Sequence, residues 1–263
     1  MTLLVALLLA ASQPPGAQLF ADGNAAYLEG DLPRAIAAYE ALASEGILSP
    51  QLETNLAAAY LRQGKRGLCA LHLERALFLD PSDDDARADL LEVRRGNVDK
   101  LEGDLQESGA DALAGLLAPL PGGPAAFSLV LFWAAAWILL ALRVVRGRPR
   151  WAGASAAACF ALALLAALFT WGAATGRKLA LQRAVVVAPA APAREGPSEK
   201  NVSHFEVHEG TTVRVEDEEA GFRRVKLANG LVGWVPAASV ALVVPPGWAG
   251  RPVISGAPRA AQP

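Results

Sequence analysis

The chain has 263 residues, of which 53% are hydrophobic and only 19% are charged, and its formal net charge at pH 7 is −2. Soluble domains average about 45–50% apolar and about 25% charged residues, so this composition favours membrane segments joined to soluble parts. Nothing in this near-neutral chain suggests the basic face that a nucleic-acid-binding protein needs. Two cysteines exclude a disulfide framework.

The charges are unevenly distributed along the chain. Residues 1–120 carry 18 acidic and nine basic side chains, whereas residues 121–182 carry six basic side chains and no acidic one. Residues 183–263 are balanced, with eight acidic and nine basic side chains. The net charge therefore averages an acidic region, an apolar region and a balanced region.

The first predicted element is a signal peptide over residues 1–17. Its apolar run, from Leu3 to Ala11, is too short to span a membrane, and Ala10 and Ser12 supply small residues for cleavage. We therefore expect the residues that follow to be exported.

Residues 18–100 are predicted to form stacked helical hairpins. Gly30 and Gly64 lie 34 residues apart in similar surroundings, and small residues recur at the matching positions Ala35 and Cys69. A fixed period with small residues where two helices meet is typical of a helical repeat. The segment resembles the tetratricopeptide repeat, in which the two glycines would form the turns between helices.

That resemblance implies a concave face that holds a peptide and is lined by the first helix of each pair. The residues that would face this groove are Asn24, Tyr27, Leu28, Thr54, Asn55, Ala58 and Arg62. The two asparagines are similar to part of a carboxylate clamp, but we favour a packing or backbone-bonding role, because an exposed polar residue alone is weak evidence of a site. The acidic balance predicts a neutral or basic partner.

After a linker over residues 101–123, two transmembrane helices are predicted over residues 124–145 and 151–175. Both lie in uncharged stretches that can supply the roughly 20 apolar residues of a membrane span. Ionisable residues are absent from both apolar runs, which argues against a pump or carrier.

The loop between the two helices, residues 146–150, is predicted to be cytoplasmic. Cytoplasmic loops collect Lys and Arg. Arg146, Arg148 and Arg150 lie in this loop, and Arg143 lies just before it. The folded parts on both sides of the hairpin would then be extracytoplasmic, in agreement with the signal peptide.

Residues 183–245 change to a period of two, which predicts strands. The strand-like runs are Ala184 to Ala188, Thr211 to Glu216, Phe222 to Leu227, Gly230 to Pro236 and Ala238 to Val244. Asn229-Gly230 is a strong signal for a tight hairpin. Residues 246–263, rich in Pro, Gly and Ala, are predicted to be a disordered tail.

This C-terminal region resembles bacterial SH3-like domains. The resemblance rests on His208-Glu209-Gly210 together with Gly233-Trp234-Val235. Phe222 and Trp234 are the candidate platform for a ligand, although packing is the favoured role for aromatic residues in strands.

The sequence contains no motif for catalysis, metal binding or a cofactor. It has no phosphate loop and no nucleophile with a recognisable base. His204 and His208 would stand about 13 Å apart in an extended strand, too far to share one ion. We therefore expect a non-enzymatic protein without a metal or cofactor.

Together the elements predict a multidomain membrane protein. Its fold class would combine all-α tetratricopeptide-repeat hairpins, a two-helix transmembrane hairpin and a small all-β SH3-like barrel, in a bacterial inner membrane with two passes. This order of parts resembles the BatE family of aerotolerance-operon proteins along nearly the whole chain.

The BatE resemblance implies a scaffold that acts with membrane-bound von Willebrand factor A-type Bat proteins and a MoxR-type ATPase in envelope integrity or stress tolerance. The alternative is a cell-wall-binding or envelope-sensing module, in which the barrel binds peptidoglycan or a peptide. Membrane lipid is an expected partner in both cases, and nucleic acid is not.

Overall fold

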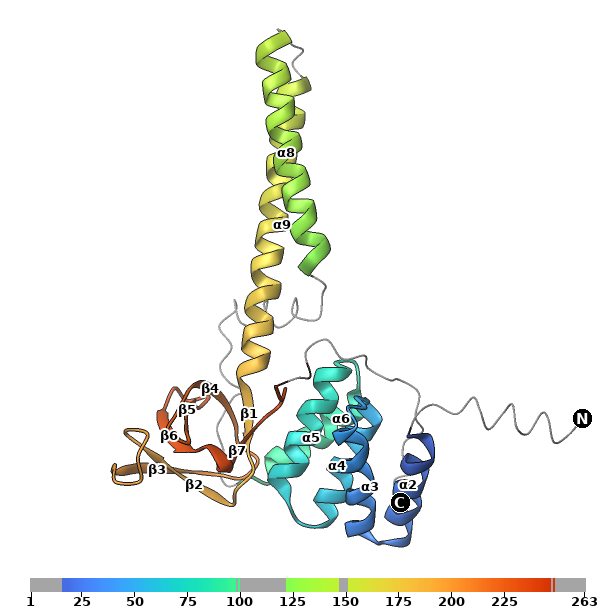
Figure 1. Ribbon diagram of the computed structural model, residues 1–263. Helices are drawn as coiled ribbons and strands as arrows, with labels where there is room; N and C mark the ends of the chain where they lie inside the picture. The colour runs from blue at the N-terminus through green and yellow to red at the C-terminus, as the bar shows by residue number, and fades with distance from the viewer. Residues whose placement is uncertain (1–15, 98, 100–121, 147–150, 247, 249–263) are drawn as a thin grey trace, which may run out of the picture. The chain divides into compact units, whose positions relative to one another are not determined.

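Figure 1 shows a computed structural model, which describes residues 16–97, 99, 122–146, 151–246 and 248. The chain divides into two compact units. The first, which we call the folded unit, comprises Met1–Leu105 and Gln182–Pro263, and the second, the inserted unit, comprises Gln106–Leu181. The folded unit is therefore built from chain on both sides of the inserted unit.

In the part of the chain that the structure describes, the helical half of the folded unit contains five helices. They are α2 (Ala17–Glu29), α3 (Leu32–Ser44), α4 (Pro50–Arg62), α5 (Arg66–Leu79) and α6 (Asp84–Arg95). Each helix packs on the next one along the chain. Gly30 and Gly64 have φ values of 83° and 77°, a left-handed conformation that glycine adopts without steric cost, so both glycines form turns between helices as expected.

Leucine and tyrosine side chains fill the core between these helices. Tyr39, Leu42, Leu52, Leu56 and Leu73 are each at most 2% exposed. Burying one such side chain contributes about 1.5–3 kcal/mol. The same cluster of buried residues also takes in Val185, Val243 and Val244, which follow the inserted unit in the sequence, so the core of the helical half extends to the sheet.

The sheet half contains one seven-stranded antiparallel sheet with the order β3-β2-β6-β5-β4-β1-β7. Its strands are β1 (Arg183–Val186), β2 (Ala190–Arg194), β3 (Ser203–His208), β4 (Thr212–Glu219), β5 (Phe222–Lys226), β6 (Val232–Pro236) and β7 (Val240–Leu242). A second cluster of buried residues, which includes Val213, Val225 and Val235, forms its own core.

The structure corrects the predicted fold class. The described residues form seven α-helices and this single sheet, not separate helical repeats and a small SH3-like barrel. The sheet is larger because β2 and β3 lie between Ala188 and Thr211, where the sequence predicts no strand. The helices are not an independent repeat array, because α5 and α6 share their core and polar contacts with the sheet.

The inserted unit contains α8 (Gly122–Arg146) and most of α9 (Trp151–Gln182). Trp133 and Trp137 of α8 make edge-to-face contacts with Phe160 of α9, with ring centroids 5.4 and 6.0 Å apart, and the two helices lie side by side in Figure 1.

Among the residues that the structure describes, one helical segment is long and apolar enough to cross a membrane, Ala154–Gln182. The apolar segment Phe127–Leu142, which lies within α8, is shorter than a span requires. The prediction of a two-helix transmembrane hairpin is therefore corrected to one candidate span. Most of the predicted signal peptide and linker, and the C-terminal tail except for Pro246 and Trp248, lie outside the described residues.

Candidate functional site

The predicted groove asparagines bond to each other and to the core. Asn24 Oδ1 accepts hydrogen bonds from the Tyr39 hydroxyl at 2.7 Å and from Asn55 Nδ2 at 2.9 Å. Burial raises the pKa of Tyr39 to about 12, although its hydrogen bonding to Asn55 acts in the opposite direction. These contacts join α2, α3 and α4, and they occupy the Asn24 oxygen that a ligand would otherwise use.

The other predicted groove residues differ in exposure. Tyr27 is buried beneath Arg62, whose Cζ lies 4.8 Å from the ring centroid and whose Nη1 donates to the Tyr27 carbonyl at 3.0 Å. Thr54 is buried and donates to the Pro50 carbonyl, and Ala58 is half-buried. Leu28, which is 63% exposed, and Arg62 are the members of this set that present side chains to solvent.

The two aromatic residues of the predicted platform are unequally accessible. Phe222 is nearly buried, whereas Trp234 is half-buried on β6. Trp234 pairs across the sheet with Arg224 of β5 and with Arg194 of β2. One aromatic ring therefore lies in a row with two arginines.

The four arginines that predicted the topology lie at and beyond the end of α8. Arg143 and Arg146 belong to its last turn, and Arg148 and Arg150 lie outside the described residues.

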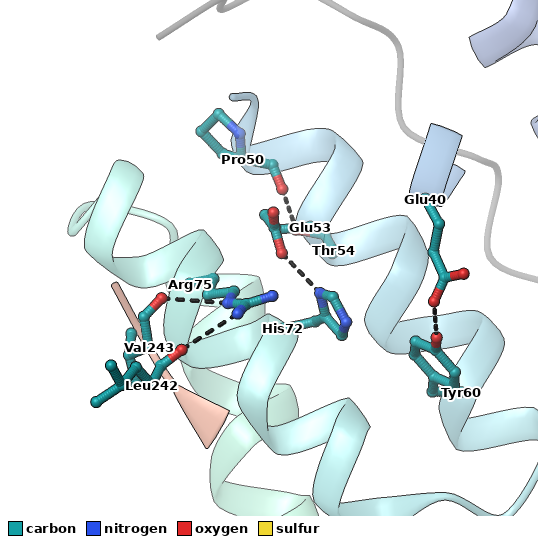
Figure 2. A network of polar contacts seen from close by, with 9 residues as sticks. All are labelled: Glu40, Pro50, Glu53, Thr54, Tyr60, His72, Arg75, Leu242 and Val243. Atoms are coloured by element: carbon teal, nitrogen blue, oxygen red, sulfur yellow. Dashed lines mark hydrogen bonds and ion pairs between the residues drawn. The ribbon is translucent and has the colours of Figure 1, made fainter. Parts of the chain in front are cut away.

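A buried acid–imidazole pair lies in the helical half, as Figure 2 shows. Glu53 of α4 is 1% exposed, and its Oε2 lies 2.7 Å from Nδ1 of His72 on α5. The His72 ring stacks on Tyr60, with centroids 5.3 Å apart, and the Tyr60 hydroxyl donates to Glu40. Burial and the neighbouring Glu40 carboxylate both raise the pKa of Tyr60.

Sequence reasoning gave this pair no role. The signal that could have revealed it is the position of Glu53 next to Leu52 and one turn before Leu56, where the helical period places core residues. A carboxylate at such a position needs a partner, because burying an unpaired charge is very costly.

Arg75 extends the network from the helical half to the sheet half. Its Nε donates to the Val243 carbonyl and its Nη2 to the Leu242 carbonyl, both at 3.1 Å (Figure 2). Burial lowers the pKa of Arg75, while the charge of Glu53 acts in the opposite direction. The Trp248 ring centroid lies 5.4 Å from its Cζ, within the range of a cation–π contact.

Glu74, the residue before Arg75, makes a second buried contact with the sheet half. Its carboxylate accepts from Arg94 at 2.5 Å and from the Thr212 hydroxyl at 3.2 Å. Arg183, the first residue of β1, lies 3.5 Å from the same carboxylate. Glu74 is 4% exposed, and the two arginines compensate its buried charge.

His208 and Thr211 bind the chain that follows α6. The Asp99 carboxylate accepts from the His208 backbone N–H at 2.7 Å and from the Thr211 hydroxyl at 3.0 Å, and it lies 2.9 Å from His208 Nδ1. Burial opposes ionisation of Asp99, but these hydrogen bonds outweigh it and lower the pKa of the carboxyl group.

Glu209 and Gly210, the two residues after His208, lie against the beginning of α5 and the chain just after α6. Glu209 Oε2 accepts from the Gly67 N–H at 3.2 Å, a donor in the first helical turn that has no partner within α5. A Cβ on Gly210 would lie 2.7 Å from Asn97 Oδ1. The segment that carried part of the SH3 resemblance thus docks the sheet onto the helices, a role that sequence reasoning missed.

We call these contacts the seam, which comprises the pairs formed by Glu74, Arg75, Asp99, Glu209 and Gly210. The hydrogen bonds of the seam that run between the two halves join groups 109 to 168 residues apart in the chain. Within the described ranges, no group of three His, Cys, Asp or Glu residues could hold a metal ion. Comparison of the chain with family models, curated proteins and solved structures finds no match.

Proposed function

We propose that the protein is a non-enzymatic, membrane-anchored scaffold for protein–protein interactions. The observation that carries this proposal is the construction of the folded unit from chain on both sides of an apolar insertion. The seam holds the two sides together, so both lie on the same side of any membrane. The chain between Leu105 and Gln182 would then leave and rejoin the same side of that membrane.

The exposed side chains of α9 support anchoring in lipid. Only 22% of the most apolar part of Ala154–Gln182 is buried, at a mean hydropathy of 2.0. The large apolar side chains of α9 that are exposed are Leu162, Leu164, Leu165, Leu168, Trp171 and Leu181. An apolar surface of this extent is typical of a membrane or protein contact.

The orientation follows from the basic residues at the end of α8. Arg143 and Arg146, with Arg148 and Arg150 beyond them, favour the cytoplasmic side. We therefore place the folded unit outside a bacterial cytoplasmic membrane. The resemblance to the BatE family supports von Willebrand factor A-type Bat proteins and a MoxR-type ATPase as partners.

The partner proposal is tested by crosslinking in native membranes followed by mass spectrometry. Leu28 and Arg62 are exposed on the helical half, so Leu28→Asp and Arg62→Glu should lower the yield of crosslinks to an A-domain protein at least fivefold. Lys200→Glu, in an exposed loop of the sheet half, is the matched control and should leave the yield unchanged. Recovery of no A-domain protein by the unaltered chain contradicts the proposal.

A second candidate function, cell-wall binding, is favoured by the position of Trp234 between Arg194 and Arg224. An aromatic face flanked by cations suits a sugar polymer that carries carboxylates. The full chain in detergent should then pellet with purified peptidoglycan, and Trp234→Ala should abolish pelleting while Val232→Ala, on the same strand, should not. Equal pelleting of both variants would exclude this use of Trp234.

A further inference from the structure

The two edge strands of the sheet, β3 and β7, differ in how their outward backbone groups are bonded. On the β7 edge, Arg75 donates to the Leu242 carbonyl at 3.1 Å and Arg223 donates to the Val240 carbonyl at 2.6 Å. These side chains protect that edge, as proteins commonly do, because an unpaired edge strand can pair with another chain. β3 lies at the opposite end of the strand order and is the second edge (Figure 1).

The backbone groups of His204 and Glu206 point away from the sheet, toward this open edge. In an antiparallel ladder, alternate residues bond to the neighbouring strand. The His208 N–H donates to Asp99, whereas the N–H of the next residue, Glu209, donates back to the chain just before β2 at 3.3 Å. Residues of β3 that are an even number of positions from His208 therefore face the open edge, as His208 does.

A proline in β2 agrees with this assignment. Pro192 lies opposite Glu206 and has no N–H, so it suits a position that forms no ladder bond to β3. The side chains of His204 and Glu206 are exposed, whereas Val207 is buried in the core of the sheet half. In the part of the chain that the structure describes, no bond from outside the ladder reaches the backbone of His204 or Glu206.

The sequence of this edge is complementary to itself. If two copies of β3 pair antiparallel, residues that face the open edge lie opposite each other. A register that places Glu206 opposite Glu206 is unfavourable, because like charges directly opposite are destabilising. Placing His204 opposite Glu206 of the second copy instead sets an imidazole against a carboxylate, and two-fold symmetry repeats this pair.

We propose that the β3 edge binds the β3 edge of a second copy of this chain, antiparallel, with His204 of each copy opposite Glu206 of the other. Each such pair exchanges two N–H···O hydrogen bonds between the backbones. Asp99 already occupies the His208 N–H, so the pairing ends there.

This inference goes beyond the proposed scaffold function and rests on it only for membrane anchoring. One pair of short strands buries little area compared with a stable interface between soluble proteins. Chains confined to the same membrane meet at a raised effective concentration, which compensates for the small contact.

Disulfide crosslinking tests both the contact and its register. Cys69 and Cys159 are first replaced by Ala, and differently tagged full chains carrying His204→Cys or Glu206→Cys are reconstituted together in lipid vesicles. Hydrogen-bonded antiparallel neighbours have Cα atoms about 5.5 Å apart, which suits a disulfide. The mixture should form the mixed disulfide at least fivefold faster than either variant alone, or than chains carrying Lys200→Cys in an exposed loop.

A proline at position 204 provides an independent test. His204→Pro removes the outward N–H and keeps the ladder to β2, and proline is tolerated on edge strands, so the free energy of unfolding should change little. Energy transfer between full chains labelled at Glu219→Cys, in vesicles with a large excess of lipid, should fall at least fivefold in His204→Pro. His204→Ala keeps the N–H and is the matched control, which should retain most of the signal.

A mixed disulfide that forms no faster than the controls would overturn the inference, and so would faster crosslinking of either single variant, which indicates another register. Energy transfer that persists in folded His204→Pro would assign self-association to a different surface and would also overturn it. If His204→Pro does not fold, the disulfide result decides alone. Crosslinking to an A-domain protein through Leu28 and Arg62 does not use this edge, so failure here is distinguishable from failure of the scaffold proposal.

Discussion

Gly210 shows how one residue position determines the contact between the two halves. Its φ is +81°, which favours glycine, and Asn97 occupies the space that a side chain would need. Gly221 provides a natural comparison, because its φ is +79° and no atom lies within 4 Å of the place where its Cβ would stand.

Gly210→Ala should therefore destabilise the protein more than Gly221→Ala. Both variants incur the cost of a left-handed alanine, about 1–2 kcal/mol, and Gly210→Ala adds an overlap that typically costs about 1–3 kcal/mol. Urea unfolding of the two variants in detergent measures the difference. Equal midpoints would show that Asn97 moves aside and that the seam tolerates a side chain there.

His72→Ala should be strongly destabilising because it leaves Glu53 buried without its partner. Breaking a buried pair in this way typically costs about 3–5 kcal/mol. His204 pairs with Glu195 at 2.8 Å on the surface, so His204→Ala is the matched control, expected to cost less than about 1 kcal/mol. Urea unfolding measures both variants. Comparable losses of unfolding free energy in His72→Ala and His204→Ala would mean that water reaches Glu53.

Asp99 should give the protein an acid-sensitive contribution to stability. Its pKa is lower in the folded protein than the ordinary value of 3.8. The unfolded chain therefore binds its proton first as pH falls, and the stabilisation is present above that ordinary value and lost as pH falls through the folded pKa. Asp99→Asn should lower the free energy of unfolding at pH 7 and flatten its decline below about pH 4.

The control for this pH experiment is Asp22→Asn, on the exposed surface of α2. The measurement is the free energy of unfolding of the wild type and of both variants between pH 3 and pH 7. If the free energy of unfolding falls with pH as steeply in Asp99→Asn as in the wild type, the acid sensitivity belongs to other carboxylates of the seam.

At the scale of elements, the helices could be predicted and part of the sheet could not. The spacing of Gly30 and Gly64 located the turns, because few residues other than glycine adopt a left-handed conformation at low cost. β2 has the sequence AAPAR, which is rich in residues depleted in strands, so its pairing with β3 is set by tertiary contacts. Asn229-Gly230 correctly predicted the hairpin between β5 and β6.

Gly67→Ala should reverse the usual effect of removing a glycine from a helix. Alanine normally stabilises a helix by about 1 kcal/mol relative to glycine, but a Cβ here would lie 2.7 Å from the Val186 carbonyl oxygen. We expect the variant to loosen the seam, so the His208 amide that donates to Asp99 should exchange its hydrogen faster. Unchanged exchange there, compared with amides of the β5–β6 ladder, would contradict this expectation.

At the scale of the whole molecule, composition predicted an apolar segment but not the packing of the two sides around it. The contact between Arg75 and Val243 spans 168 residues, and no local pattern encodes a pairing at that distance. The sequence pattern around Glu74 and Arg75 gives neither residue a role. Their roles become visible only when the partners across the seam are placed.

The two sides of the insertion should respond identically to a reagent that cannot cross membranes. Asp22→Cys lies in the helical half and Glu219→Cys in the sheet half, both at exposed positions, and Cys69 and Cys159 would be replaced first. In intact spheroplasts an impermeant maleimide should label both new cysteines. Labelling of only one would contradict the placement of both sides of the insertion on the same side of the membrane, and labelling of neither would invert the proposed orientation.

The separation of Arg75 from Val243 in the sequence also determines the order in which the two are made during biosynthesis. About 150 residues lie between the end of α6 and Val243, and ribosomes add about 5–20 residues per second. The newly made helices therefore wait on the order of 10 s before the segment that covers Arg75 emerges. During that interval we expect the nascent protein to present this face to chaperones, and a pause in translation within the insertion would prolong its exposure.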